Sequence, residues 1–160
     1  MFTLETNSAE ETIACGRRFA KILKINDIVV LEGALGGGKT TFVKGIVAGL
    51  GYTKRVLSPT FTLLRQYRLK KMNVNHLDLY RLSAKEAGNE EFQEYLYPRD
   101  SITLVEWGEK VEDGLASFIK VEFYFLTEDK RKLVFSCYPG QCDRLRSLSR
   151  HFSEKRFDPV

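Results

Sequence analysis

Residues 33–40 read G-A-L-G-G-G-K-T, a complete G-x-x-x-x-G-K-[ST] pattern. The run Ile28–Leu31 just before it is aliphatic and mostly β-branched, which predicts a strand buried on both faces of a sheet. After Lys39, apolar residues recur with helical spacing over 42–50, and Gly51 supplies a left-handed stop. The pattern therefore lies between a buried strand and a helix.

This loop has the chemistry of a phosphate site. Glycines let the backbone approach an anion closely, and the N–H groups and the positive end of the following helix point at it. Lys39 is placed to reach the β- and γ-phosphates, and the Thr40 hydroxyl to bind the Mg²⁺ between them. The residues predicted to bind the nucleotide are Leu35, Gly36, Gly37, Gly38, Lys39 and Thr40.

Length and composition indicate an ordinary globular protein. A chain of 160 residues with 43% hydrophobic and 29% charged residues can bury a core of its own. The net charge of +4 permits contact with RNA or with an acidic partner but argues strongly for neither. The aliphatic runs are too short to cross a membrane, and the acidic N-terminus is unlike a signal peptide. We therefore expect a cytosolic protein with no membrane contact.

Four further elements are predicted from patterning. The box Ser8–Glu11 begins a helix that runs to about Lys24 and precedes the nucleotide strand. Residues 83–96 have a helical pattern, and 118–126 with 132–137 form an antiparallel hairpin. The fold predicted is a single α/β domain of P-loop type over 1–138, with a mostly parallel central sheet and the hairpin at one edge. Residues 139–160 form a polar, partly helical tail.

Two segments beyond the loop carry hydroxyl and carboxyl groups. The loop around Ser58 and Thr60 either contacts Mg²⁺ or the γ-phosphate, as switch loops do, or is an ordinary turn before a strand. On the next strand, His76 and Asp78 share a face. We interpret Asp78 as functional and His76 as structural.

A third segment ends in an acid. The apolar strand Ile102–Val105 leads to Glu106, at the position where a carboxylate orients magnesium in P-loop folds, because ligands gather at the carboxyl ends of the strands. Trp107 is either a core residue or a flat surface for a purine. The three cysteines, Cys15, Cys137 and Cys142, have no zinc-binding spacing and are interpreted as reduced thiols.

With these motifs in order, namely the loop, S-P-T-F-T-L at 58–63, H-L-D-L-Y-R at 76–81 and V-E-W-G at 105–108, the chain resembles the bacterial TsaE (YjeE) family over roughly residues 6–137. The resemblance implies a small cytosolic ATPase that is required, with TsaB and TsaD, to make threonylcarbamoyladenosine in tRNA. It implies contact with those two proteins, while tRNA is expected to be contacted indirectly or weakly.

The resemblance also assigns residues. By position, Lys39, Thr40 and Thr41 match the nucleotide loop of the family, and Asp78 matches the acid of its H-x-D-x-Y-R motif. Glu106 matches the magnesium-associated acid and Trp107 the residue beside it. The family often has proline or serine where this chain has Gly108.

The predicted reaction is Mg²⁺-dependent hydrolysis of ATP. Lys39, the loop amides and the metal stabilise the transferring phosphoryl group, and Thr60 belongs to the catalytic set. Asp78 orients the attacking water, deprotonates it or holds a metal-bound water. Slow turnover without partners is expected, because no arginine is obviously placed to act as a finger.

Three other classes of protein share parts of this pattern. A small-molecule kinase needs an arginine-rich lid, whereas Arg65, Arg68 and Arg81 are dispersed over strands. A regulatory GTPase carries an N-K-x-D motif, which this chain lacks. A nucleotide-gated binding module, in which hydrolysis resets a protein contact, overlaps with the predicted role.

Overall fold

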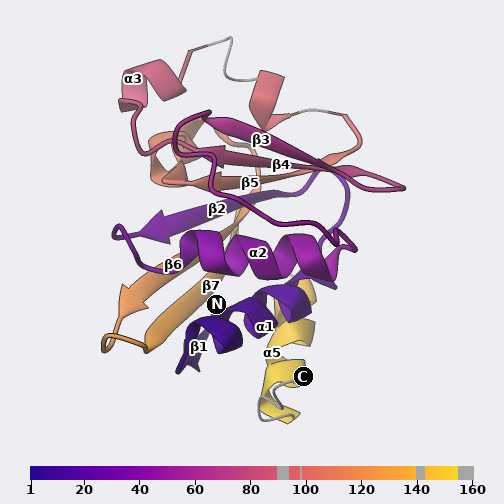
Figure 1. Ribbon diagram of the computed structural model, residues 1–160, viewed down its shortest axis with the longest axis vertical. Helices are drawn as coiled ribbons and strands as arrows, with labels where there is room; N and C mark the ends of the chain where they lie inside the picture. Colours follow the sequence, from indigo (N-terminus) through magenta and orange to yellow (C-terminus); the bar gives the residue numbers. More distant parts are fainter. Residues whose placement is uncertain (90–93, 98, 140–142, 155–160) are drawn as a thin grey trace.

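The computed structural model describes residues 1–89, 94–97, 99–139 and 143–154. Its seven strands form one sheet in the order β1-β7-β6-β2-β5-β4-β3 (Figure 1). The four central strands, β6, β2, β5 and β4, are parallel to one another, whereas β7, β1 and β3 pair antiparallel at the two sides. This arrangement confirms an α/β fold of P-loop type with a parallel centre and antiparallel flanks.

The strands have the following bounds: β1 Phe2–Thr6, β2 Ile28–Gly33, β3 Leu64–Arg68, β4 Asn73–Asp78, β5 Ser101–Glu106, β6 Phe118–Phe125 and β7 Arg131–Tyr138. The helices are α1 Ala9–Ala20, α2 Lys39–Gly49, α3 Ala84–Ala87 and α5 Asp143–Glu154, with 3₁₀ turns η1 Gly108–Lys110 and η2 Glu112–Gly114.

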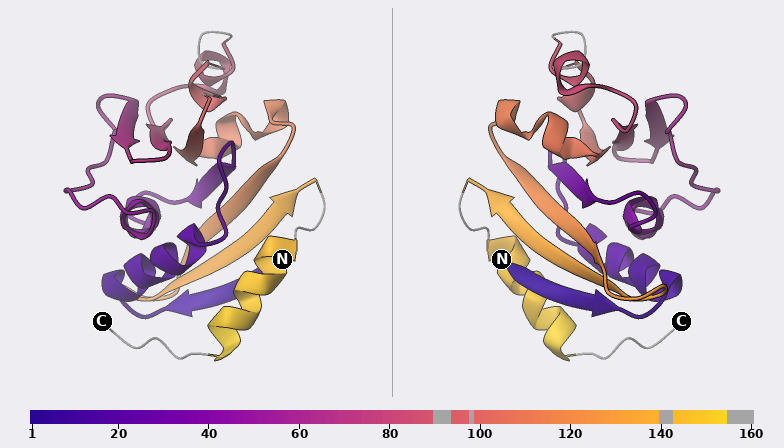
Figure 2. Two further views of the ribbon diagram at one scale, coloured as in Figure 1. Left: turned by 90° about the vertical axis from the view of Figure 1, so that its right-hand side faces the viewer. Right: turned by 90° about the vertical axis from the view of Figure 1, so that its left-hand side faces the viewer.

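The hydrophobic core lies on both faces of the sheet because successive residues of its buried central strand point to opposite sides. Val29 and Leu31 face the layer that contains α1 and α2, whereas Ile28 and Val30 face the layer with Leu77 and Val111. Figure 2 shows α1 and α2 together on one face of the sheet. Parallel strands covered on both faces carry continuous apolar runs, as 28–31 does.

Helices α1 and α2 touch through glycine. A Cβ added at Gly45 would lie 2.1 Å from the Ile13 carbonyl oxygen, and one at Gly16 would lie 3.0 Å from the Gly45 Cα. No residue larger than glycine fits at this crossing without moving a backbone. The contact therefore fixes the position of α2, whose first turn carries Lys39 and Thr40.

The N-terminal region contains a strand that was not predicted from the sequence. Strand β1 covers the free side of β7, with Phe2 opposite Phe135. Its alternation of Phe2 and Leu4 with polar neighbours is a strand signal of period two. Ser8 caps α1 as predicted by accepting a hydrogen bond from the Glu11 amide, but α1 ends at Ala20. The carboxylate of Glu11 bonds to the amide of Asn7 rather than completing the box.

The predicted single helix over 83–96 is wrong. Helix α3 begins with a capping box between Ser83 and Glu86 and ends at Ala87, with Gly88 as its C-cap. Glycine is a poor interior helix residue because fixing its backbone costs more entropy than fixing that of other residues, so the helix stops there. The part of the prediction at 90–93, with Glu90 and Glu91, lies outside the described residues.

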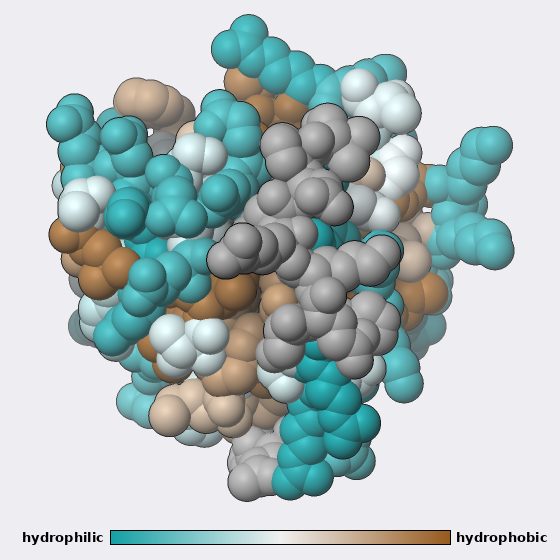
Figure 3. Space-filling view, turned by 90° about the horizontal axis from the view of Figure 1, so that it is seen from below, coloured by the Kyte–Doolittle hydropathy of each residue, from teal (hydrophilic) through white to brown (hydrophobic). Residues whose placement is uncertain are grey.

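Helix α5 belongs to the segment predicted as a polar tail. Its Leu145 and Leu148 are buried in the core on the α1 side of the sheet, and Arg144 donates two hydrogen bonds to the Asp27 carboxylate, at 2.6 and 3.0 Å. From below, hydrophilic side chains cover most of the visible surface outside the grey residues, with smaller hydrophobic areas between them (Figure 3). Residues 140–142 and 155–160 of this segment lie outside the described part of the chain.

The cysteine prediction holds for one residue and fails for another. Cys15 is a free thiol with no exposed surface. Cys137 is disulfide-bonded, so its interpretation as a reduced thiol is wrong. Cys142 lies outside the described residues.

Among the described helices, none is long and apolar enough to cross a bilayer.

Candidate functional site

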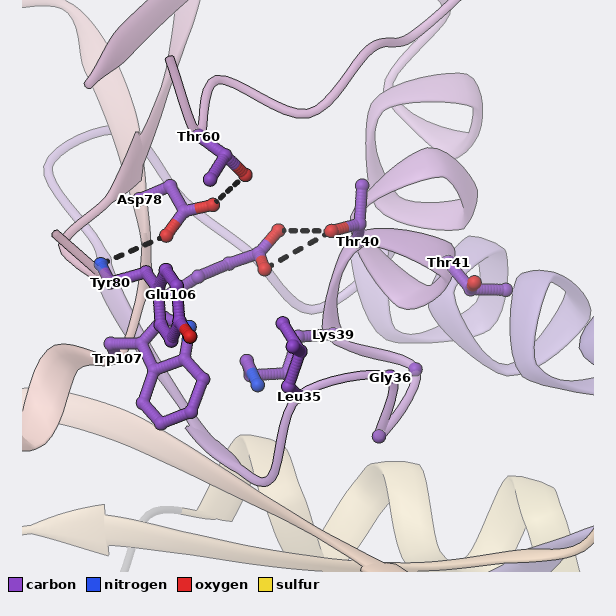
Figure 4. Close-up of a pocket in the computed structure, with 12 residues that line it drawn as sticks. Leu35, Gly36, Lys39, Thr40, Thr41, Thr60, Asp78, Tyr80, Glu106 and Trp107 are labelled. Atoms are coloured by element: carbon purple, nitrogen blue, oxygen red, sulfur yellow. Dashed lines mark hydrogen bonds between the residues drawn. The ribbon is translucent and has the colours of Figure 1, made fainter. Parts of the chain in front are cut away.

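A pocket opens at the carboxyl ends of β2, β4 and β5 (Figure 4). Because these strands are parallel, their carboxyl ends meet at one edge of the sheet, and the residues that follow each strand gather there. All residues predicted for the site line this pocket: Leu35, Gly36, Gly37, Gly38, Lys39, Thr40, Thr41, Thr60, Asp78, Glu106 and Trp107. Tyr80, which was not predicted, lines it as well.

The loop owes its shape to its glycines. Gly33 has φ 141°, and a Cβ there would lie 2.6 Å from the Phe123 carbonyl oxygen. Gly38 has φ 104° and is the N-cap of α2, without any side-chain cap. Residues with side chains rarely adopt such angles, so the turn requires glycine. The first amides of α2 are therefore directed at the pocket without a competing side-chain acceptor.

Lys39 is buried, with 4% of its surface exposed. Its Nζ donates hydrogen bonds to the carbonyl oxygens of Gly33, at 2.5 Å, and Ala34, at 2.9 Å. Nζ also lies 4.1 Å from the centre of the Trp107 ring. Burial lowers the pKa of Lys39, and the nearby carboxylate of Glu106 opposes that shift. The ammonium group is thus held at the loop by carbonyls and an aromatic face.

Glu106 links three elements. Thr40 on α2 donates its hydroxyl proton to Glu106 Oε1 at 2.8 Å and to Oε2 at 3.1 Å. His76 on β4 lies with Nε2 at 2.8 Å from the same Oε1, and its ring is fully buried. His76 Nδ1 has no hydrogen-bond partner among the described residues. Because the carboxylate receives contacts from both sides, its orientation toward Thr40 is fixed.

Asp78 forms a second cluster beside the first. Thr60 donates its hydroxyl proton to Asp78 Oδ2 at 2.5 Å, and the Tyr80 amide donates to Oδ1 at 3.0 Å. The hydroxyl of Ser58 lies 2.6 Å from that of Thr60. The loop at 58–60 is therefore tied to the carboxylate at the end of β4. Figure 4 shows Thr60 and Asp78 directed toward each other, whereas Thr41 points away from both carboxylates.

Trp107 is half-buried and adopts a left-handed conformation, with φ 60° and ψ 37°. Its ring packs at 5.1 Å from that of Tyr80 and also faces the Lys39 ammonium group. The next residue is glycine because the chain passes very close to β2, and a Cβ on Gly108 would lie 2.8 Å from Val30 Cγ1. A residue with a Cβ at this position would require Val30 or the backbone to shift.

Lys110 stabilises the segment that follows Asp78. Its Nζ donates hydrogen bonds to the carbonyl oxygens of Leu79, Tyr80 and Leu82 at 2.8, 3.1 and 2.8 Å. Three carbonyls that converge on one ammonium group hold the turn after β4 in a fixed path.

The donor set suits magnesium. Mg²⁺ binds oxygen ligands, keeps several waters and commonly uses one or two protein groups together with substrate phosphates. The adjacent Thr40 hydroxyl and Glu106 carboxylate are two such oxygen donors. Among the described residues there is no cluster of three or more His, Cys, Asp or Glu side chains that would form an all-protein cage.

Arg131 is a neighbour of the loop that the sequence did not reveal. Its guanidinium stacks on the Phe125 ring, 4.2 Å from the ring centre, and its Cγ lies 4.0 Å from the position of a Cβ added at Gly38. Its Nη1 donates to carbonyl oxygens of the β6–β7 turn. These contacts of Arg131 exist because the β6–β7 hairpin lies beside the loop, so they cannot be predicted from a local sequence pattern.

The strand, loop and helix at 28–49, with a carboxylate at the end of the neighbouring parallel strand, define a P-loop α/β protein. More specifically, the chain belongs to the TsaE family, because the family model described as "Threonylcarbamoyl adenosine biosynthesis protein TsaE" matches residues 6–133.

Named relatives support the same family. The chain is 35% identical over 148 residues to the "tRNA threonylcarbamoyladenosine biosynthesis protein TsaE" of Bacillus subtilis (strain 168), over 91% of this chain and 92% of the relative. It is 36% identical to the protein of that name from Treponema pallidum, over 80% and 95%. A crystal structure of Bacillus subtilis YdiB superposes with a TM-score of 0.77 at 31% identity, over 94% of this chain and 95% of that one.

Proposed function

We propose that this protein is a Mg²⁺-dependent ATPase that acts in the cytoplasm with TsaB and TsaD in the threonylcarbamoyladenosine modification of tRNA. The observation that supports hydrolysis most directly is the pair of carboxylates at the loop, each hydrogen-bonded to a threonine hydroxyl: Glu106 to Thr40 and Asp78 to Thr60. The pathway is supported by the names of the relatives.

The loop binds the triphosphate. Its amides and the N-terminus of α2 donate hydrogen bonds to phosphate oxygens, and Lys39 neutralises charge on the β- and γ-phosphates. Thr40 and Glu106 hold Mg²⁺, which neutralises charge on the phosphates when bound. When a triphosphate binds, the Lys39 ammonium group exchanges its hydrogen bonds to the Gly33 and Ala34 carbonyls for bonds to the phosphates. This exchange needs only a small movement of the side chain, because both carbonyls belong to the same loop.

Asp78 orients the attacking water by accepting one of its hydrogen bonds. The water oxygen forms a bond to the γ-phosphorus, the bond from that phosphorus to the β-bridging oxygen breaks, and ADP leaves with the electron pair. The proton of the water passes to phosphate or solvent. Thr60 already donates a hydrogen bond to Asp78 Oδ2, so the position of this hydroxyl depends on what binds at Asp78 in the pocket.

Phosphate release by the purified chain tests this proposal. ATP with Mg²⁺ should give slow release of phosphate that rises when TsaB and TsaD are added, and removal of Mg²⁺ with EDTA should abolish it. Added small alcohols or amines should remain unphosphorylated. Phosphoryl transfer to such an acceptor in place of water would favour a kinase, and absence of release with both partners present would refute the ATPase.

A further inference from the structure

A second depression in the surface lies on the α1 and α2 side of the sheet and shares no lining residue with the nucleotide pocket. It is a groove of about 600 Å³ between the exposed flank of α1, the flank of α2 and the segment 52–56. Four cationic side chains line it: Arg17, Lys44, Lys54 and Arg55. The lining contains no acidic residue. Such a one-sided set of charges indicates an anionic ligand.

The helix crossing brings two of these charges together. Arg17 follows Gly16 and Lys44 precedes Gly45, and these two glycines are the residues at which the helices touch. The side chains of Arg17 and Lys44 therefore begin from neighbouring backbone positions on two different helices. Both are exposed, and neither has an ion-pair partner among the described residues.

The same holds for the segment that closes the groove. Lys54 and Arg55 are exposed and also have no acidic partner in the described part of the chain. Just before them, Tyr52 is half-buried in the lining, and its ring packs edge-on against that of Tyr67 at 5.0 Å. The aromatic ring is thereby held in place beside the cations.

We propose that this groove binds the phosphate backbone of tRNA directly. A groove that combines several cations with a fixed aromatic ring is the arrangement that tracks a nucleic-acid backbone and stacks a base, whereas an acidic peptide needs no aromatic surface. The inference rests on the proposed role in tRNA modification and deepens it. It assigns a specific surface to the contact with tRNA, which the sequence led us to expect to be indirect or weak.

Binding of a fluorescently labelled, unmodified tRNA transcript to the full chain without nucleotide tests the proposal, by anisotropy over a range of salt concentrations. Each phosphate contact contributes a slope of about 0.7 to the logarithmic salt dependence, or about fivefold in affinity at about 0.1 M salt relative to about 1 M. The double variant Arg17→Gln/Lys44→Gln should therefore bind about 25-fold more weakly at about 0.1 M and show a slope smaller by about 1.4. The double variant Lys54→Gln/Arg55→Gln should lose a similar factor.

The matched control is Lys85→Gln/Arg99→Gln, which likewise removes one lysine and one arginine charge, but from exposed positions outside the groove lining. Lys85 lies on α3, which is far from α1 in Figure 1. Its affinity should stay within about twofold, because the contacts are local. Equal weakening in both sets would mean that net charge alone attracts RNA and would overturn the proposal. Equal competition by poly-glutamate of matched charge would instead assign the groove to an acidic protein.

Failure of this inference is distinguishable from failure of the proposed ATPase. The binding assay contains no nucleotide, so its outcome does not depend on hydrolysis, and phosphate release is measured without RNA. A chain that releases phosphate but gives the same tRNA affinity in the groove variants refutes the groove alone. Thermal unfolding of each variant checks that the substitutions leave the fold intact.

Discussion

Asp78 and Glu106 occupy paired positions at the ends of the parallel strands β4 and β5, and each accepts a hydrogen bond from a different threonine. Glu106 is tied to Thr40 on the loop helix, whereas Asp78 is tied to Thr60 on a separate loop. Two neighbouring carboxylates are thus hydrogen-bonded to two different segments of the chain. In the proposed mechanism, Glu106 holds the metal and Asp78 orients the attacking water.

Lys39→Ala should weaken binding of a triphosphate at least tenfold. A charge-assisted hydrogen bond contributes about 1.5–3 kcal/mol, and about 1.4 kcal/mol corresponds to a factor of ten. Titration calorimetry with a non-hydrolysable ATP analogue measures the change. The exposed Lys85→Ala is the control and should bind normally. Unchanged affinity of the Lys39 variant for the triphosphate would show that this loop is not the phosphate-binding site.

Glu106→Gln should raise the Mg²⁺ concentration needed for half-maximal phosphate release by at least about tenfold, because an amide oxygen is a weaker ligand for magnesium than a carboxylate. Nucleotide affinity without metal should change little. A magnesium titration at saturating ATP distinguishes the two effects. The side chain keeps its size and a hydrogen-bonding oxygen, so a wild-type magnesium dependence would place the metal elsewhere.

Thr60→Ala should reduce the difference in partner affinity between nucleotide states. If the γ-phosphate draws the 58–63 loop through its hydroxyls, the ATP and ADP forms present different surfaces, and by linkage a partner that prefers one form changes nucleotide affinity by the same factor. Binding to a TsaB–TsaD complex is compared with ATP analogue, ADP and no nucleotide. Thr60→Ser, which keeps the hydroxyl, should behave as wild type. Equal partner affinity in all three states would exclude a switch.

Gly45→Ala should destabilise the fold by about 1–3 kcal/mol, because the added Cβ would lie 2.1 Å from the Ile13 carbonyl oxygen and force the helices apart. Urea unfolding gives the free-energy change. Gly88→Ala is the matched control, since the contacts of its added Cβ begin only at 3.3 Å and its φ is negative. A loss no larger than that of the control would mean that the crossing can relax.

Cys15 should make stability fall at alkaline pH. Burial raises the pKa of its thiol above the ordinary value. In the unfolded chain the thiol ionises near about pH 8.5, so above that pH the unfolded state binds fewer protons and is favoured. The stabilising contribution is fully present below that pH and is lost as the pH rises, by up to about 1.4 kcal/mol per unit.

Urea unfolding between about pH 7 and 10 measures this loss, with Cys15→Ala as the reference because it lacks the thiol. The small cavity left by the substitution lowers stability at every pH, so the wild type begins more stable and its advantage narrows as the pH rises. A constant difference between the two proteins across the range would contradict the assignment.

Local patterns were sufficient to predict the parts of the site that lie within short segments. The glycines, Lys39 and Thr40 follow one another in the chain, and positive φ angles require glycine at Gly33, Gly36 and Gly38. The acid that ends β5 was predicted as a site residue because ligands gather at the carboxyl ends of the strands in any parallel sheet, whatever the strand order. The strand–loop–helix order followed from hydrophobic periodicity.

The relation between these segments was decided only by tertiary structure. Placing β5 between β2 and β4 brings Glu106 within reach of both Thr40 and His76, and hydrophobic periodicity carries no information about strand order. The cationic groove likewise exists because Gly16 and Gly45 let two helices touch. The sequence by itself determined the glycine-rich loop at 33–40 and the candidate phosphate-binding residues in it, since these depend on backbone freedom and charge within a few residues. Which side chains share a surface was decided by packing, because contacts between distant segments are set by the burial of the whole core.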